Sequence, residues 1–131
     1  MYEELLMFCE NVLKNRAVVS IRPSEVRLLM LLGNAGGVCN PATMAQVLGV
    51  SKPMITASLA NLIKLGLVAK VPSPEDGRSV LVLPTKKGGQ LLNEIKQKNQ
   101  NFMDDLAEKI GRKKFESFIK TIVDLNNLMK K

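Results

Sequence analysis

The side chains with recognisable chemistry gather between residues 51 and 66, and that chemistry is the binding of an anionic surface. Two ammonium groups and two hydroxyls stand here among small or featureless side chains: Ser51, Lys52, Pro53, Thr56, Ala57, Ala60 and Lys64. Ammonium groups attract phosphate oxygens, hydroxyls donate and accept hydrogen bonds, and small side chains let a backbone approach its partner closely. These residues suit the binding of a polyanion.

No residue set in the sequence supports catalysis. The 131 residues include no histidine, which removes imidazole bases, Ser-His-Asp and Cys-His nucleophiles and most catalytic zinc sites. Cys9 and Cys39 lack the paired spacing of a metal knuckle or a disulfide framework. We therefore expect a protein that is not an enzyme, with two reduced thiols, no metal and no cofactor.

The stretch from Ser51 to Leu65 has the signals of one helix. Ser51 can cap free N–H groups, Pro53 falls in the first turn, and Gly66 can take the left-handed turn that ends a helix. The side chains predicted to be buried are Ile55, Ser58, Leu59, Leu62 and Ile63, and those predicted to face outward are Pro53, Thr56, Ala57, Ala60 and Lys64. The outward face suits a DNA major groove, but a core helix covered on both sides fits this pattern equally well.

The neighbouring elements complete a known arrangement. Helices are predicted at residues 1–15, 21–32 and 42–48, and strands at 67–71 and 79–83. Gly49 and Val50 alone separate the third helix from Ser51, which is the spacing of a helix-turn-helix. A hairpin directly after a helix-turn-helix is the wing of a winged helix, and its tip carries Asp76 and Arg78.

Length and charge agree with a DNA-binding protein. A chain of 131 residues is one domain by size, and its formal net charge is +7. Residues 41–88 hold six basic and two acidic side chains, so the basic excess surrounds the predicted recognition helix. The start of the chain is acidic and no apolar run is long enough to span a bilayer, so we expect a cytoplasmic protein without a membrane partner.

The end of the chain carries more apolar surface than one small domain can bury. Thr85 can cap a helix that runs to about Ile110, and a last helix follows Gly111. Both helices have continuous apolar stripes, and so does the helix at residues 1–15. We expect a homodimer, whereas the alternative is a monomeric bundle in which these helices cap their own domain.

Several motifs together resemble the multiple antibiotic resistance regulator (MarR) family of dimeric transcription factors. The resemblance covers most of the chain and rests on three segments at the family's spacing: Ser51 to Val68, Asp76 to Ser79, and Thr85 to Gly88. It implies a mainly α fold, of α+β type, with a winged helix-turn-helix at about 21–84. It also implies dimerisation helices at about 1–16 and 85–131 within a single domain.

The resemblance also implies roles for individual residues. The helix at Ser51–Leu65 would enter the major groove, Arg78 would reach the minor groove, and Asp76 would orient Arg78. The sequence departs from the family at Ala57, where an arginine is common, and at Arg22, where a capping threonine is usual. It also departs at Pro84, which replaces a leucine.

Two further properties of the family can be compared with this sequence. Some members sense oxidants through a cysteine in the first helix, but Cys9 falls on an apolar stripe, which favours an inert packing residue. Members also bind small aromatic effectors. The seven methionines could line a cleft for a small aromatic or apolar effector, although methionines at helical spacing are also ordinary core residues.

We therefore expect a sequence-specific regulator of transcription, a repressor, that binds a pseudo-palindromic operator in double-stranded DNA as a homodimer and is released by a small-molecule effector. The residues predicted to bind DNA are Ser51, Lys52, Pro53, Thr56, Ala57, Lys64, Asp76 and Arg78. The alternative is a winged-helix module that uses the same surface to bind protein and has no specific affinity for DNA.

Overall fold

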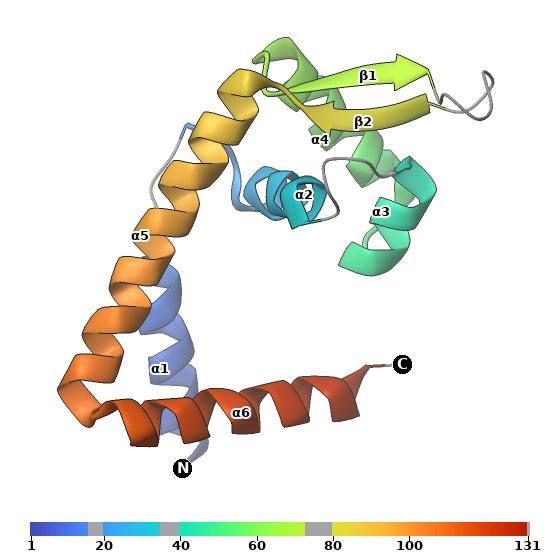
Figure 1. The fold of residues 1–131 in the computed structure, drawn as a ribbon. Coiled ribbons are helices and arrows are strands. Elements are labelled where there is room, and N and C mark those ends of the chain that lie inside the picture. Colours follow the sequence, from blue (N-terminus) through green and yellow to red (C-terminus); the bar gives the residue numbers. More distant parts are fainter. Residues whose placement is uncertain (16–19, 35–39, 73–79, 131) are drawn as a thin grey trace. The chain divides into compact units, whose positions relative to one another are not determined.

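The computed structural model describes residues 1–15, 20–34, 40–72 and 80–130, in which the chain forms two compact units. The elements in chain order are α1 (Tyr2–Lys14), α2 (Pro23–Asn34), α3 (Pro41–Leu48), α4 (Lys52–Lys64), β1 (Val68–Pro72), β2 (Val80–Pro84), α5 (Lys86–Ile110) and α6 (Arg112–Met129) (Figure 1). One unit comprises residues 18–95, and the other comprises residues 1–17 and 96–131. The predicted fold class, mainly α with a winged helix-turn-helix and flanking helices, is confirmed.

The unit of residues 18–95 has its own apolar core. Helices α2, α3 and α4 pack together, and the hairpin of β1 and β2 packs on α2 and α4. The core cluster of this unit contains Ile21, Leu28, Leu29, Leu32, Met44, Ala45, Ile55, Leu59, Leu62, Leu67, Val68, Val82 and Leu92. These residues come from each of its helices and both strands, so the recognition helix is held by the whole unit.

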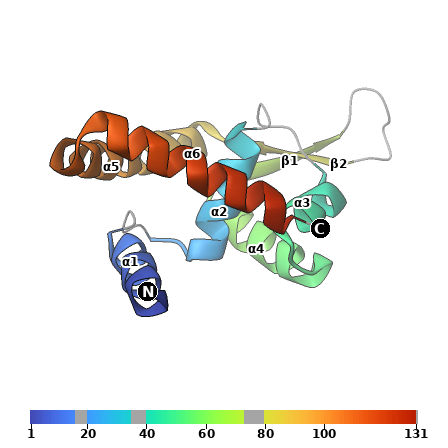
Figure 2. The same cartoon turned by 90° about the horizontal axis from the view of Figure 1, so that it is seen from below.

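The two strands form the antiparallel hairpin that the sequence predicts. Val68 pairs with Pro84 and Pro72 with Val80 in this hairpin (Figure 2). Val82 is fully buried, whereas Val80, which is on the same face of β2, is 44% exposed, so the core reaches Val82 but not the start of β2. Each strand begins one residue later than predicted, which is the usual uncertainty of a boundary.

Helix α5 begins with contacts to the end of α4. The Thr85 hydroxyl accepts from the Gly88 N–H at 3.1 Å and donates to the Gly66 carbonyl at 2.6 Å. The Lys87 ammonium donates to the Leu65 carbonyl at 3.0 Å. A Cβ atom on Gly88 would collide with the Leu67 carbonyl oxygen, so only glycine lets α5 approach this closely.

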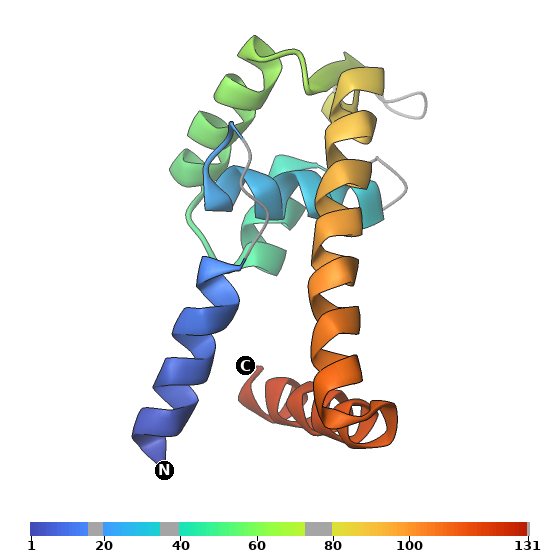
Figure 3. The same ribbon diagram turned by 90° about the vertical axis from the view of Figure 1, so that its left-hand side faces the viewer.

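Helix α5 then runs without a break for 25 residues (Figure 3). Thr85 therefore caps α5 as predicted, and the helix ends at Ile110 as predicted. No described helix is both long and apolar enough to cross a membrane.

The other unit, which contains α1, the second half of α5, and α6, has almost no core. None of the described residues of α1 or α6 is buried. Phe8 and Phe118 meet edge to face with ring centroids 5.4 Å apart, and Ala107 is 2% exposed. The large apolar side chains of this unit that stay exposed include Leu5, Leu6, Met7, Leu13, Ile110, Val123, Leu125, Leu128 and Met129.

The exposure of α1 corrects one expectation. Cys9 is exposed in the single chain, so the prediction that its thiol is buried in packing is wrong for one copy. The apolar stripe of α1 is present, but the described residues of the same chain do not cover it. Cys39 lies outside the described residues, and the division of the chain into domains stays a prediction.

Candidate nucleic-acid interface

Local signals fix the start of the recognition helix α4. Gly49 takes the left-handed conformation, with φ 67°, and ends α3. Ser51 then caps α4, because its hydroxyl oxygen accepts from the Met54 N–H at 3.3 Å, and Pro53 lies in the first turn. The two helices are therefore joined by a tight turn whose geometry follows from the residue types.

One face of α4 is buried and the predicted outward face is exposed. Ile55, Leu59 and Leu62 are at most 2% exposed. The exposed residues along the other face are Pro53, Thr56, Ala57, Ala60 and Lys64, and Ser51 and Lys52 at the start are exposed as well. A core helix covered on both sides by its own chain is thereby excluded.

The prediction for Ile63 is wrong. Its side chain is 37% exposed, although the sequence places it on the buried side. At about 100° per residue, Ile63 lies at the edge of the buried face, close to the direction of Thr56, and the buried face is narrower than periodicity alone suggests. Ser58, also predicted to be buried, is half-buried on the opposite edge.

Thr56 has a more restricted chemistry than its type suggests. Its hydroxyl donates to the Lys52 carbonyl at 3.0 Å, so the proton is already engaged inside the helix. The oxygen still has an acceptor lone pair, which fits the exocyclic amino group of a base. Met54, which the sequence analysis did not include, is 51% exposed and adds apolar surface beside these residues.

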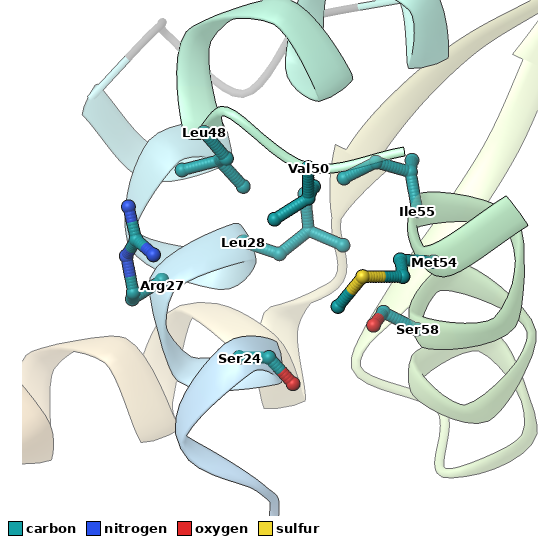
Figure 4. A pocket seen from close by; sticks show the side chains of 8 residues that line it. All are labelled: Ser24, Arg27, Leu28, Leu48, Val50, Met54, Ile55 and Ser58. Atoms are coloured by element: carbon teal, nitrogen blue, oxygen red, sulfur yellow. The ribbon is translucent and has the colours of Figure 1, made fainter. Parts of the chain in front are cut away.

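A small cavity marks the seam between α2 and the helix-turn-helix. Figure 4 shows that it is lined from α2, from α3 and the turn, and from α4, with side chains of Arg27, Leu48, Val50 and Met54 among them. Its volume of about 20 Å³ is enough for about one water molecule. The seam is therefore a packed joint of the helix-turn-helix and has no room for an organic ligand.

A buried carboxylate connects α2 to the recognition helix. Glu25 is 3% exposed, and its Oε1 accepts from the Arg22 N–H at 2.9 Å. Its Oε2 accepts from the Asn61 side-chain amide of α4 at 2.6 Å. Both oxygens thus have partners, which a buried carboxylate needs. Sequence analysis missed this link because Glu25 and Asn61 are 36 residues apart.

The described part of the wing consists of its two strands, β1 and β2. Asp76 and Arg78 lie outside the described residues, and so do the other residues between the strands, 73–79. Their predicted roles therefore stay predictions. Among the described residues, no cluster of three or more Cys, Asp or Glu side chains could hold a metal ion.

The chain is similar to known regulators of transcription. A sequence profile described as "MarR family" matches residues 20–79. A relative from Mycobacterium bovis, called an uncharacterized HTH-type transcriptional regulator, is 29% identical over 89 residues, which span 68% of this chain and 62% of the relative. The matched region is thus less than two thirds of the relative.

Solved structures of DNA complexes share the fold. The crystal structure of FabT from Streptococcus pneumoniae in complex with DNA has a TM-score of 0.81 and 20% identity, and covers 98% of this chain and 97% of FabT. The transcriptional repressor CouR, bound to a 23-mer DNA duplex, has a TM-score of 0.76 and 28% identity, and covers 95% of this chain and 88% of CouR. The winged helix-turn-helix described above is therefore a fold found in DNA-bound proteins.

Proposed function

We propose that this chain, whose residues 20–79 match the profile of the MarR family, is a transcriptional regulator that represses transcription by binding a specific operator in duplex DNA as a homodimer. One observation carries the proposal: α4 exposes a face of small and basic side chains while its opposite face is buried. Such a helix can lie deep in a major groove, because the small side chains of Ala57 and Ala60 let its backbone approach the bases.

Each residue of this surface has a proposed role. Lys52 and Thr56 contact base edges, and Ser51 and Lys64 contact phosphates at the two ends of α4. Pro53 and Ala57 let the helix approach closely, for example against the methyl groups of thymine. Direct recognition of bases is modest, because few side chains on this face can donate or accept hydrogen bonds.

The wing is proposed to supply a second contact. Arg78 reaches into a minor groove beside the major groove that α4 occupies, and Asp76 orients the guanidinium. A narrow minor groove concentrates negative potential, which favours an arginine there. Arg78→Ala is expected to weaken operator binding by roughly 1–3 kcal/mol, and Asp76→Ala is expected to weaken it less.

The homodimer is supported by the exposed apolar residues of α1 and α6. These helices expose side chains such as Leu5, Leu125 and Leu128, which a second copy of the chain can cover. A two-fold dimer presents two recognition helices, so the operator is an inverted repeat with half-site centres about 10 base pairs apart or a multiple of that.

A small apolar or aromatic effector is proposed to release the operator. Met103 and Ala107 of α5, with Phe115 and Ile119 of α6, line an open pocket of about 270 Å³ whose surface is largely apolar. The pocket is a candidate place for such a compound. An aromatic compound that binds there should lower operator affinity, and Ile119→Glu should abolish that response.

Two measurements test the proposed function. A random duplex pool should yield bound fragments with an inverted repeat, and the logarithm of affinity should fall linearly with the logarithm of salt concentration. A chain that binds no duplex DNA at low salt would favour the alternative, a winged-helix module that binds protein.

A substitution in α4 tests the proposed surface directly. Ala57→Glu places a carboxylate on the exposed face, so it should abolish operator binding while the thermal unfolding temperature stays close to that of the original protein. Full operator affinity in this variant would mean that α4 does not face the DNA.

A further inference from the structure

A basic side chain that does not belong to α4 or to the wing lies beside the outward face of α4. The exposed Arg22, directly before α2, lines an open pocket of about 240 Å³ together with Ser24, Glu25, Ala57, Ser58 and Asn61. Ala57 belongs both to this pocket and to the outward face of α4. The Arg22 side chain therefore emerges at the edge of the surface proposed to meet DNA.

The backbone of Arg22 is tied to α4 through two hydrogen bonds. Its N–H donates to Glu25 at 2.9 Å, and the same carboxylate accepts from Asn61 of α4 at 2.6 Å. Because Glu25 is 3% exposed, water competes little for either bond. The position of Arg22 relative to the recognition helix is therefore set by a buried carboxylate and does not depend on a free loop.

The guanidinium of Arg22 is available for a partner outside the chain. Within the described residues it makes no hydrogen bond or ion pair, since the Glu25 oxygens already accept from a backbone N–H and from Asn61. Ala57 and Ser58 are small, so the pocket leaves room for the long arginine side chain to lie along α4. A planar guanidinium with several N–H donors matches the oxygens of a phosphate.

We propose that Arg22 is a further DNA-contacting residue, whose guanidinium reaches past Ala57 to a phosphate of the backbone that borders the major groove occupied by α4. This inference rests on the proposed function. The contact adds affinity and fixes the register of α4 along the groove, but it does not discriminate between bases. Glu25 is a positioning residue for this contact, because it holds the Arg22 backbone against α4.

The first experiment compares Arg22→Ala with Arg27→Ala across a range of salt concentrations. Arg27 is a matched control, because it is an exposed arginine about one and a half turns further along the chain that does not line the pocket of Arg22. Arg22→Ala should weaken binding about five- to tenfold for operator and mixed-sequence duplexes alike, and the salt slope should fall by about 0.9. Arg22→Lys should keep most of the affinity.

Comparison with Arg27→Ala and with the original protein shows which hypothesis is wrong if the expected result is not obtained. Equal losses for Arg22→Ala and Arg27→Ala would show a general effect of net charge and would overturn the inference. If the original protein binds DNA with a steep salt slope and Arg22→Ala leaves that slope unchanged, Arg22 makes no phosphate contact and only this inference fails. If the original protein binds no duplex at low salt, the proposed function itself fails.

A double-mutant cycle tests the role of Glu25. If Glu25 acts through Arg22, Glu25→Ala should weaken binding several-fold in the original protein and much less in the Arg22→Ala background. Losses that simply multiply would show that Glu25 acts through Asn61 alone, which would overturn its role as the positioning residue of Arg22. Glu25→Gln keeps an acceptor for the Arg22 N–H, so it should restore most of the affinity and serves as the test if the alanine variant unfolds.

Discussion

Both units of the chain contain helices with apolar stripes, but only the unit of residues 18–95 buries them. In residues 18–95 the stripes of α2 and α4 are buried, with Leu28 and Leu62 fully so. In the unit of residues 1–17 and 96–131, α1 and α6 have equally regular stripes, yet none of their described residues is buried. A regular stripe therefore shows which face of a helix can be buried, but it does not show whether the same chain buries that face.

The reason is the number of elements that meet. Three helices and a hairpin enclose a core from several sides in residues 18–95. The other unit has three helical segments and no strand among its described residues, and each Å² of apolar surface left in water costs about 25 cal/mol. The unit of residues 18–95 needs no partner for its core, whereas the other unit gains stability by finding one.

The largest expected effect is that of a charge placed in the exposed apolar surface of α6. Leu128 is 81% exposed in one chain, so Leu128→Asp should leave the unit of residues 18–95 folded while it dissociates the proposed dimer. Operator affinity should fall by about 100-fold or more, because two half-sites are no longer bound by one linked molecule. Sedimentation and duplex titration measure both quantities. Asn126→Asp on the same helix is the control, and a Leu128→Asp variant that remains dimeric would rule out α6 as part of the interface.

The next largest effect is the loss of stability when a buried apolar side chain is shortened, compared with the loss when an exposed one is shortened. Leu62→Ala should lower the free energy of unfolding by about 2–5 kcal/mol at any protein concentration, because it opens a cavity in the core of one chain. If the proposed dimer buries Leu5, which is 54% exposed in one chain, Leu5→Ala should lower stability by an amount that shrinks as the protein is diluted. Denaturant titrations at two protein concentrations measure the difference. A Leu5→Ala effect that does not depend on concentration would contradict the contrast.

A smaller effect concerns the joint between α4 and α5. Gly88→Ala should destabilise the protein by about 1–3 kcal/mol, because the new Cβ meets the Leu67 carbonyl. Gly89→Ala meets no atom within 4 Å and should be neutral or stabilising by up to about 1 kcal/mol. Thermal unfolding of the adjacent pair measures this difference directly. Equal effects of the two substitutions would mean that α5 does not approach Leu67 closely.

The smallest expected effect is that of removing the side-chain cap at the start of a helix. Ser51 and Asn40 accept from backbone N–H groups of α4 and α3, whereas α1 and α6 start at Met1 and Gly111 without a side-chain cap. Ser51→Ala should cost about 1 kcal/mol, and Ser51→Gly only a few tenths. If DNA affinity falls equally in both variants, the hydroxyl contacts DNA; if it falls only with stability, Ser51 acts as a cap alone.

Local signals in the sequence were enough to predict the elements and the outward face of α4. The cap at Ser51, the left-handed Gly49 and the cap at Thr85 act within a few residues, and the starts of α4 and α5 agree with them. Helix α2 begins at Pro23, two residues later than predicted, because Glu25 bonds the Arg22 N–H and Pro23 takes a first-turn position. Helical periodicity alone predicts the outward face of Pro53, Thr56, Ala57, Ala60 and Lys64, but not the exposure of Ile63.

Only the tertiary structure decided which side chains meet across the chain. The bond from Asn61 to Glu25 and the pocket shared by Arg22 and Ala57 depend on how α2 packs against α4. The exposure of Ile63 depends on how far the core extends around α4. Cys9 is exposed for a related reason, since its stripe has no cover in the described part of its own chain. Periodicity gives the direction of each side chain around its helix, but the width of the buried face and the identity of the partner come from packing between distant segments.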